Sequence, residues 1–144
     1  MISFKNFPVK NKTLTNLDIN DYAKKLNIRH FIGHRMRDEL VGKPKNNECC
    51  IVNCDLSSGN GTHYGCYFKK ENKKICFDSF GLSPLIEIQN YLGTNILYST
   101  FRLQKLDESN CGKFCLYILY LLEKGYDFVY IVLNLLNERN GEGV

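Results

Sequence analysis

The sequence has no hydrophobic run long enough to cross a membrane. Its longest apolar stretch, around residues 114–122, is far shorter than the roughly 20 residues of a transmembrane helix, so we expect no membrane-spanning segment. The first stretch, MISFKNFPVKNK, lacks the apolar core of a secretory leader. Internal repeats, domain linkers and low-complexity segments are missing too. These absences favour one domain over residues 1–144 with a single sizeable core.

A strong excess of charge of either sign is also missing. Nineteen Lys and Arg oppose fifteen Asp and Glu, and the net charge of +4 is well below that of a dedicated nucleic-acid binder. We interpret the short basic groups, such as Lys69-Lys70 and Lys73-Lys74, as solvated faces or loops. The alternative, a weak polyanion groove, lacks the interleaved aromatic residues of a single-strand binder.

The seven cysteines do not predict a disulfide framework or a metal site. Their number is odd and no leader is visible, so we expect a reducing, intracellular setting. Cys49, Cys50 and Cys54 do not match a zinc-ligand spacing, because adjacent residues of a strand face opposite ways.

The pattern along the chain predicts a mixed α+β domain. Residues 1–13 read as an irregular lead-in, 31–47 as a long loop and 139–144 as a loose tail. Apolar periodicity and turn signals predict helices near 15–26, 83–92, 111–125 and 127–138, and strands near 48–55, 63–68, 73–78 and 95–104.

The segment LQKLDESNCGKFCLYILYLL, residues 103–122, contains a candidate nucleophile. If Asn110 caps the buried helix that follows, Cys111 is its first residue, where unpaired amides and the helix dipole favour a thiolate. Gly112 leaves room beside that thiol for a substrate backbone. Cys115 lies a full turn deeper, so we interpret it as a core residue.

A thiolate at this position needs a cationic partner, because two carboxylates close before Cys111 disfavour the negative charge. His30 and His34 read as hydrogen-bonded structural residues. His63 differs: a hairpin symmetric about Lys70-Glu71 places it opposite Asp78, with Cβ atoms about 5 Å apart. A carboxylate there would fix the imidazole tautomer and stabilise its charged form. A turn centred one residue later would instead pair His63 with the residue at position 80.

Gln104 is the candidate donor to an oxyanion. Acyl transfer through a thiolate develops a negative oxygen, and neutral amide donors stabilise it. Residues 105–110 separate Gln104 from Cys111, which is enough for a loop that folds the amide back toward the thiol. The alternative for an isolated glutamine is simple surface polarity.

Taken in this order, the residues resemble the adenovirus-type cysteine proteases: adenain and its relatives in virophages and large self-synthesising DNA transposons. The resemblance covers roughly residues 15–125 and rests on ECCIVNCD, GTHYGCYF, CFDSFGLS and LQKLDESNCGKFC. It implies a papain-like fold in which a central buried helix carrying the nucleophile packs on a mixed or antiparallel sheet, with flanking helices. It also implies that His63 is the general base or imidazolium, Asp78 its orienter, Gln104 the oxyanion-hole residue and Cys111 the nucleophile.

This resemblance implies an endopeptidase that cleaves Gly-containing sites in capsid or core precursors of a virus or mobile element. We expect protein substrates, at most weak nucleic-acid contact, no required cofactor, no metal and a monomer. The setting would be a virion or a virus factory in the host nucleus or cytoplasm. The spacing of seven residues from Gln104 to Cys111 favours the viral branch over the SUMO- and ubiquitin-like-protein proteases, which usually place the glutamine six residues before the cysteine.

Two departures bear on this expectation. Tyr64 stands where the family usually has tryptophan after the histidine, and we expect it to stack on the ring more weakly. Adenain is activated partly by a peptide disulfide-linked to a cysteine before the glutamine. The corresponding stretch LGTNILYST has none, so activation through that disulfide is not expected, and DNA stimulation rests on the mild basic charge alone. The alternative functions are a SUMO or ubiquitin-like-protein isopeptidase and an inactive peptide- or DNA-binding module.

Overall fold

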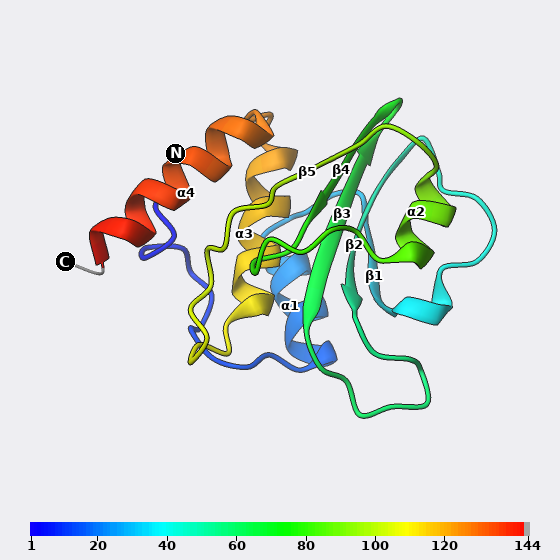
Figure 1. Ribbon diagram of the computed structural model, residues 1–144, viewed down its shortest axis with the longest axis horizontal. Coiled ribbons are helices and arrows are strands. Elements are labelled where there is room, and N and C mark those ends of the chain that lie inside the picture. The colour runs from blue at the N-terminus through cyan, green and yellow to red at the C-terminus, as the bar shows by residue number, and fades with distance from the viewer. Residues whose placement is uncertain (143–144) are drawn as a thin grey trace.

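A five-stranded mixed sheet forms the centre of the computed structural model, which describes residues 1–142 (Figure 1). The strand order is β1-β2-β3-β4-β5. The inner pairs β2–β3 and β3–β4 are antiparallel, whereas the outer strands β1 and β5 are parallel to their neighbours β2 and β4. The strands are β1 (Phe31–Met36), β2 (Asn47–Asn53), β3 (Tyr64–Lys70), β4 (Lys73–Phe77) and β5 (Ile96–Tyr98).

The helices cover both faces of this sheet, as Figure 1 shows. They are α1 (Asn16–Lys25), α2 (Ile86–Leu92), α3 (Cys111–Glu123) and α4 (Phe128–Glu142), with a 3-10 turn η1 (Arg37–Glu39) after β1. Because side chains alternate along a strand, Cys49 and Ile51 of β2 pack in the larger core with α1, α3 and α4. Their neighbours Cys50 and Val52 pack in a smaller core with α2. The predicted α+β class is confirmed, including a central helix on a mixed sheet.

Helix α3 is the central helix because it is apolar almost all round. Nearly all its residues from Cys111 to Leu122 are buried, and a helix of that composition is stable only inside a protein. Lys113 is buried as well, and its ammonium lies 4.4 Å from the centroid of the Phe4 ring. Among the described residues, no helix is long and apolar enough to cross a bilayer.

The segment 31–47 corrects the sequence interpretation. It is not one long loop, because residues 31–36 form strand β1 and 37–39 form η1. All six residues of β1 are half-buried, so the strand has no alternation of buried and exposed positions for the sequence to reveal. Its parallel pairing with β2 is a long-range contact. Helix α2 also begins later than expected, at Ile86, and β5 is only three residues long.

The two ends of the described chain are better ordered than the sequence suggested. Residues 1–13 contain no helix or strand, but Phe4, Phe7 and Val9 are buried in the larger core. The backbone amides of Phe4 and Lys5 donate to the carboxylate of Glu138 in α4. The expected loose tail from residue 139 is wrong for residues 139–142, because α4 continues to Glu142. Residues 143–144 lie outside the described part.

Candidate active site

The candidate nucleophile occupies the predicted position, the first residue of α3. Cys111 is 9% exposed, and the first main-chain bond of the helix runs from the Phe114 amide to the Asn110 carbonyl at 3.2 Å. Asn110 is the N-cap residue, but its side chain does not cap the helix; its Nδ2 donates to Asn11 Oδ1 at 2.6 Å. The expected Asn110 cap bond is therefore wrong. The amides of the first turn keep no bond from this side chain, and amides in that position favour an anion.

Glycine at position 112 allows the N-terminus of α3 to lie close to the chain before α1. A Cβ added at Gly112 would lie 3.0 Å from Cδ1 of Leu14 and 3.3 Å from its Cβ. Any side chain at this position would push Leu14 away from the first turn of α3. The glycine thus allows the chain before α1 to lie close to residue 112.

The hairpin of β3 and β4 brings His63 and Asp78 together. His63 directly precedes β3 and Asp78 directly follows β4, so both lie at one end of the antiparallel pair. The Nε2 atom of His63 is 3.0 Å from Oδ2 of Asp78, and the Phe80 amide donates to Oδ1 of Asp78 at 2.8 Å. The carboxylate is therefore held by the backbone while it orients the imidazole.

The strand register from which the sequence predicted the pair of His63 and Asp78 is wrong by two residues. The ladder pairs Cys66 with Phe77 and Phe68 with Ile75, so its continuation places Phe80, not Asp78, opposite His63. The His63 ring accordingly stacks on the Phe80 ring, with centroids 4.8 Å apart and planes at 30°. Asp78 still reaches His63 because a two-residue shift keeps it on the same face, as a diagonal neighbour.

The charge state of His63 follows from its neighbours. Burial by itself lowers the pKa of this imidazole, but hydrogen bonds to Asp78 and to the Cys111 thiol outweigh burial and raise the pKa from 6.5 to about 9. Because Asp78 occupies Nε2, the ring nitrogen left for the thiol is Nδ1. At neutral pH the site therefore holds an imidazolium between a carboxylate and the cysteine.

Gln104 lies in the same region with its side chain almost completely buried, at 3% exposure. Its Oε1 accepts a hydrogen bond from the Ser79 hydroxyl at 2.6 Å, and its Nε2 donates to the Glu108 carbonyl at 2.8 Å. The alternative that Gln104 is simply a polar surface residue is therefore excluded. Ser79 was missed from the sequence, although its place directly after Asp78 was a usable signal.

The loop between Gln104 and Cys111 is held by an arginine that the sequence did not suggest. Arg139 of α4 forms an ion pair with Glu108, and its Nε donates to the Leu103 carbonyl at 3.1 Å. Burial raises the pKa of Glu108, but the Arg139 partner prevails and lowers it. The negative charge of Glu108 is therefore offset by a cation, while Asp107 is exposed to solvent.

The remaining cysteines are chemically different from Cys111. All seven are free thiols. Burial raises the pKa of the six others, to about 12 at Cys50, Cys54 and Cys76. Cys115 is completely buried, as its interpretation as a core residue required. Within the described residues, no group of three or more His, Cys, Asp or Glu side chains could hold a metal ion.

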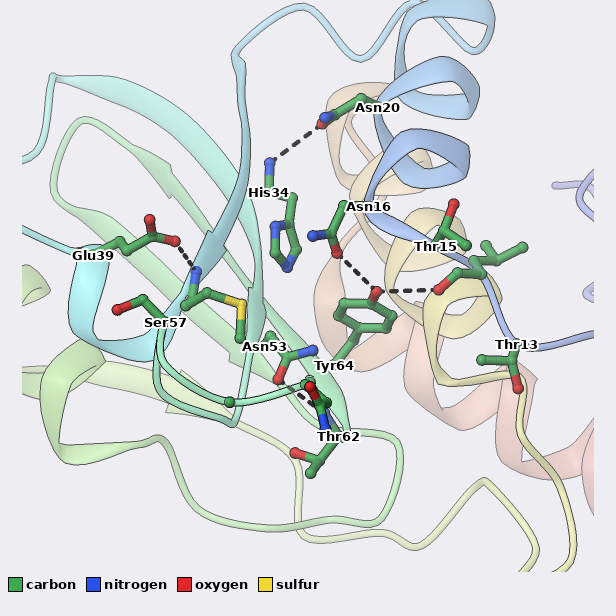
Figure 2. Close-up of a pocket in the computed structure, with 15 residues that line it drawn as sticks. Thr13, Thr15, Asn16, Asn20, His34, Glu39, Asn53, Ser57, Thr62 and Tyr64 are labelled. Carbon is green, nitrogen blue, oxygen red and sulfur yellow. Dashed lines mark hydrogen bonds between the residues drawn. The ribbon is translucent and has the colours of Figure 1, made fainter.

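A polar cavity of about 750 Å³ is lined by residues of the chain before α1, of β1 and of the loop before β3, and neither Cys111 nor His63 is among its lining residues (Figure 2). Leu14, Thr62 and Tyr64 line it, and these residues also flank Gly112 or His63. The Tyr64 hydroxyl donates to the Leu14 carbonyl at 3.1 Å. Tyr64 therefore links β3 to the chain before α1 at the cavity wall. The ring that stacks on His63 is that of Phe80, and not that of Tyr64 as expected from the sequence.

The other two histidines contribute no catalytic contact that the structure shows. His34 lines the cavity and meets Tyr64 edge-on, with ring centroids 5.7 Å apart. Burial lowers its pKa, and its Nε2 atom is buried without a hydrogen-bond partner. His30 is exposed. The expectation that both are hydrogen-bonded structural residues is therefore wrong for the His34 ring.

Comparison with known proteins places the fold. No protein-family model and no curated protein sequence matches this chain. Two crystal structures of the ASFV pS273R protease are similar. One, of the selenomethionine form, has a TM-score of 0.59 at 16% identity and covers 91% of this chain and 68% of that chain. The other has a TM-score of 0.59 at 14% identity and covers 91% and 67%. At this identity the likeness shows a shared fold.

Proposed function

We propose that this protein is a cysteine endopeptidase that hydrolyses peptide bonds through a Cys111 thioester. The observation that carries the proposal is the position of Cys111 at a helix N-terminus beside His63, whose pKa of about 9 keeps the ring protonated at neutral pH. An imidazolium next to a thiol at a helix N-terminus favours the thiolate form. The likeness in fold to a viral protease supports the same assignment.

The proposed reaction begins with attack of the Cys111 thiolate on the scissile carbonyl carbon. The new C–S bond pushes the carbonyl electron pair onto oxygen, and Nε2 of Gln104 and the Cys111 amide donate to that oxyanion. When the intermediate collapses, the C–N bond breaks and the His63 imidazolium gives its Nδ1 proton to the leaving amine. These steps use only groups of this chain.

Hydrolysis of the thioester then restores the site. Neutral His63 accepts a proton from water through Nδ1, and the resulting hydroxide attacks the thioester carbonyl. The C–S bond breaks, the carboxylic acid product leaves, and Cys111 is again a thiolate beside an imidazolium. Asp78 accepts the hydrogen bond from Nε2 throughout.

The polar cavity is the proposed binding place for the substrate chain, because two of its lining residues neighbour the proposed catalytic pair: Tyr64 directly follows His63, and Leu14 lies close to Gly112, which directly follows Cys111. We propose capsid or core precursor proteins as substrates, cleaved at Gly-containing sites in a virion or virus factory. This part of the proposal is based on the sequence motifs around His63, Asp78 and Cys111. The monomeric state, the independence of a cofactor and a weak nucleic-acid contact are proposed on the same basis.

The test compares the wild type with Cys111→Ala on a library of quenched peptides that contain glycine. The wild type should cleave a subset of the library, and Cys111→Ala should abolish cleavage with an unchanged circular dichroism spectrum. Cys76→Ala is the matched control, because Cys76 is a buried thiol in the core on the other face of the sheet. Cleavage retained by Cys111→Ala would sink the proposal. Activity confined to folded ubiquitin-like fusions would favour the isopeptidase alternative.

A further inference from the structure

Ser79 makes a contact that the reaction described above does not explain. It directly follows Asp78, it is completely buried, and its hydroxyl donates to Oε1 of Gln104 at 2.6 Å. Its backbone carbonyl also accepts from the amides of Leu103 and Gln104, at 2.8 and 2.9 Å. The chain at Ser79 thus contacts the oxyanion-hole glutamine through both main chain and side chain.

The two hydrogen bonds of the Gln104 amide define which of its ends faces which neighbour. The Glu108 carbonyl can only accept, so Nε2 must lie on that side. The Ser79 hydroxyl then has Oε1 as its acceptor. A flipped amide would place Oε1 against the Glu108 carbonyl oxygen and lose the buried hydrogen bond there, while the Ser79 hydroxyl would become an acceptor instead of a donor. In the observed orientation, Nε2 keeps a second N–H for the substrate.

We propose that Ser79 is a positioning residue of the oxyanion hole, acting through the Gln104 amide. This inference rests on the proposed function. Consecutive residues at the end of β4 then aim two separate groups: Asp78 orients His63, and Ser79 orients Gln104. One dipeptide therefore orients both the general acid and the oxyanion donor, so a movement of this strand end changes the orientation of both groups together.

The main-chain bonds of Ser79 make this role separable from a structural one. The amides of Leu103 and Gln104 remain bonded to the Ser79 carbonyl when the hydroxyl is removed. Ser79→Ala therefore keeps the chain anchored and removes only the bond to Oε1. The matched control is Ser99→Ala. Ser99 is also a buried serine, but its hydroxyl accepts from the Phe101 amide and not from or to Gln104.

The deciding experiment is a double-mutant cycle on a cleaved peptide. Ser79→Ala should lower kcat by about tenfold with little change in KM, because one hydrogen bond that orients the amide is lost. Gln104→Ala should lower kcat by about 10²- to 10³-fold, the usual effect of removing an oxyanion donor. The double variant should be no slower than Gln104→Ala alone. A serine with a merely structural role would lower kcat by the same factor in both backgrounds, and that result would overturn the proposal.

A second pair of measurements needs no peptidase activity. Alkylation of Cys111 by iodoacetamide forms no oxyanion, so its rate should be equal in wild type and Ser79→Ala; a slower rate would assign the serine to the thiol instead. The side-chain amide signals of Gln104 in ¹H–¹⁵N spectra should shift in Ser79→Ala and stay in place in Ser99→Ala. If the wild type cleaves no peptide, the proposed function fails, and these amide signals still decide the contact. Unchanged signals in Ser79→Ala would overturn it.

Discussion

Replacing Asp78 with asparagine should lower the pKa of His63 without changing the shape of the site. The pKa of His63 rises from 6.5 to about 9 even though burial acts in the opposite direction, and the bond to Asp78 is the largest contribution that raises it. Asparagine has nearly the same shape and removes the charge, but it keeps only one accepting oxygen, so only one of the His63 Nε2 atom and the Phe80 amide retains its acceptor. A neighbouring opposite charge changes a pKa by about 1–3 units, so we expect the His63 pKa to fall by roughly 2 units in Asp78→Asn.

The consequence for the site is large near pH 8. With a pKa of about 9, about 90% of His63 is imidazolium at that pH, and with a pKa near 7 only about 10% is. Two units correspond to roughly 3 kcal/mol of lost imidazolium stabilisation, because the His63 side chain is only 17% exposed and water screens its charge weakly. Because the folded pKa is raised, this stabilisation is fully present below pH 6.5 and is lost as the pH rises through about 9. The alkaline limb of peptidase activity should move down by the same interval in the variant.

The assay is a ¹H–¹³C titration of the histidine Cε1 groups between pH 5 and 10. His34, whose pKa is lowered by burial, is the internal reference and should titrate identically in all variants. Asp21→Asn removes an exposed carboxylate from α1 and is the matched control. If His63 of Asp78→Asn still titrates near 9, the ion pair does not set the charge of this imidazole, and the proposed role of Asp78 is refuted.

Two further predictions concern Cys111 and its neighbour. Limiting iodoacetamide near neutral pH should modify Cys111 before the other six cysteines, whose pKa values are raised by burial; peptide mapping checks this, and uniform labelling would contradict an activated thiol. Gly112→Ala should lower the free energy of unfolding by about 1–3 kcal/mol, because its new methyl would lie 3.0 Å from Leu14. Urea denaturation measures this, with Gly141→Ala as the control, since no atom lies within 4 Å of the added methyl there; equal midpoints for the two variants would contradict the packing argument.

Local patterns were sufficient for the elements whose stability depends on their own residues. Thr15 and Asp18 form the capping box that starts α1 near its predicted first residue. The apolar run after Asn110 predicted α3 and placed Cys111 at its first position. Strand β1 could not be predicted in the same way, because its half-buried residues carry no period and its partner β2 is distant in the chain.

The site shows the same division. The reactive groups themselves could be identified from neighbouring residues: a thiol at the start of a buried helix, a histidine and an acid at the open end of a hairpin, and a glutamine one loop before the thiol. Hairpin periodicity put His63 and Asp78 on one face, a property that survives a shift of two residues, so the pair was found with the wrong register.

The orientation of these groups depends on tertiary packing. The stacking of Phe80 on His63 follows from the actual turn position, which depends on packing against β2 and the helices. The bond from Ser79 to Gln104 and the clamp of Arg139 on Glu108 join residues 25 and 31 positions apart. A sequence pattern reports the preferences of neighbouring residues, whereas such contacts exist only after distant segments have packed into one core.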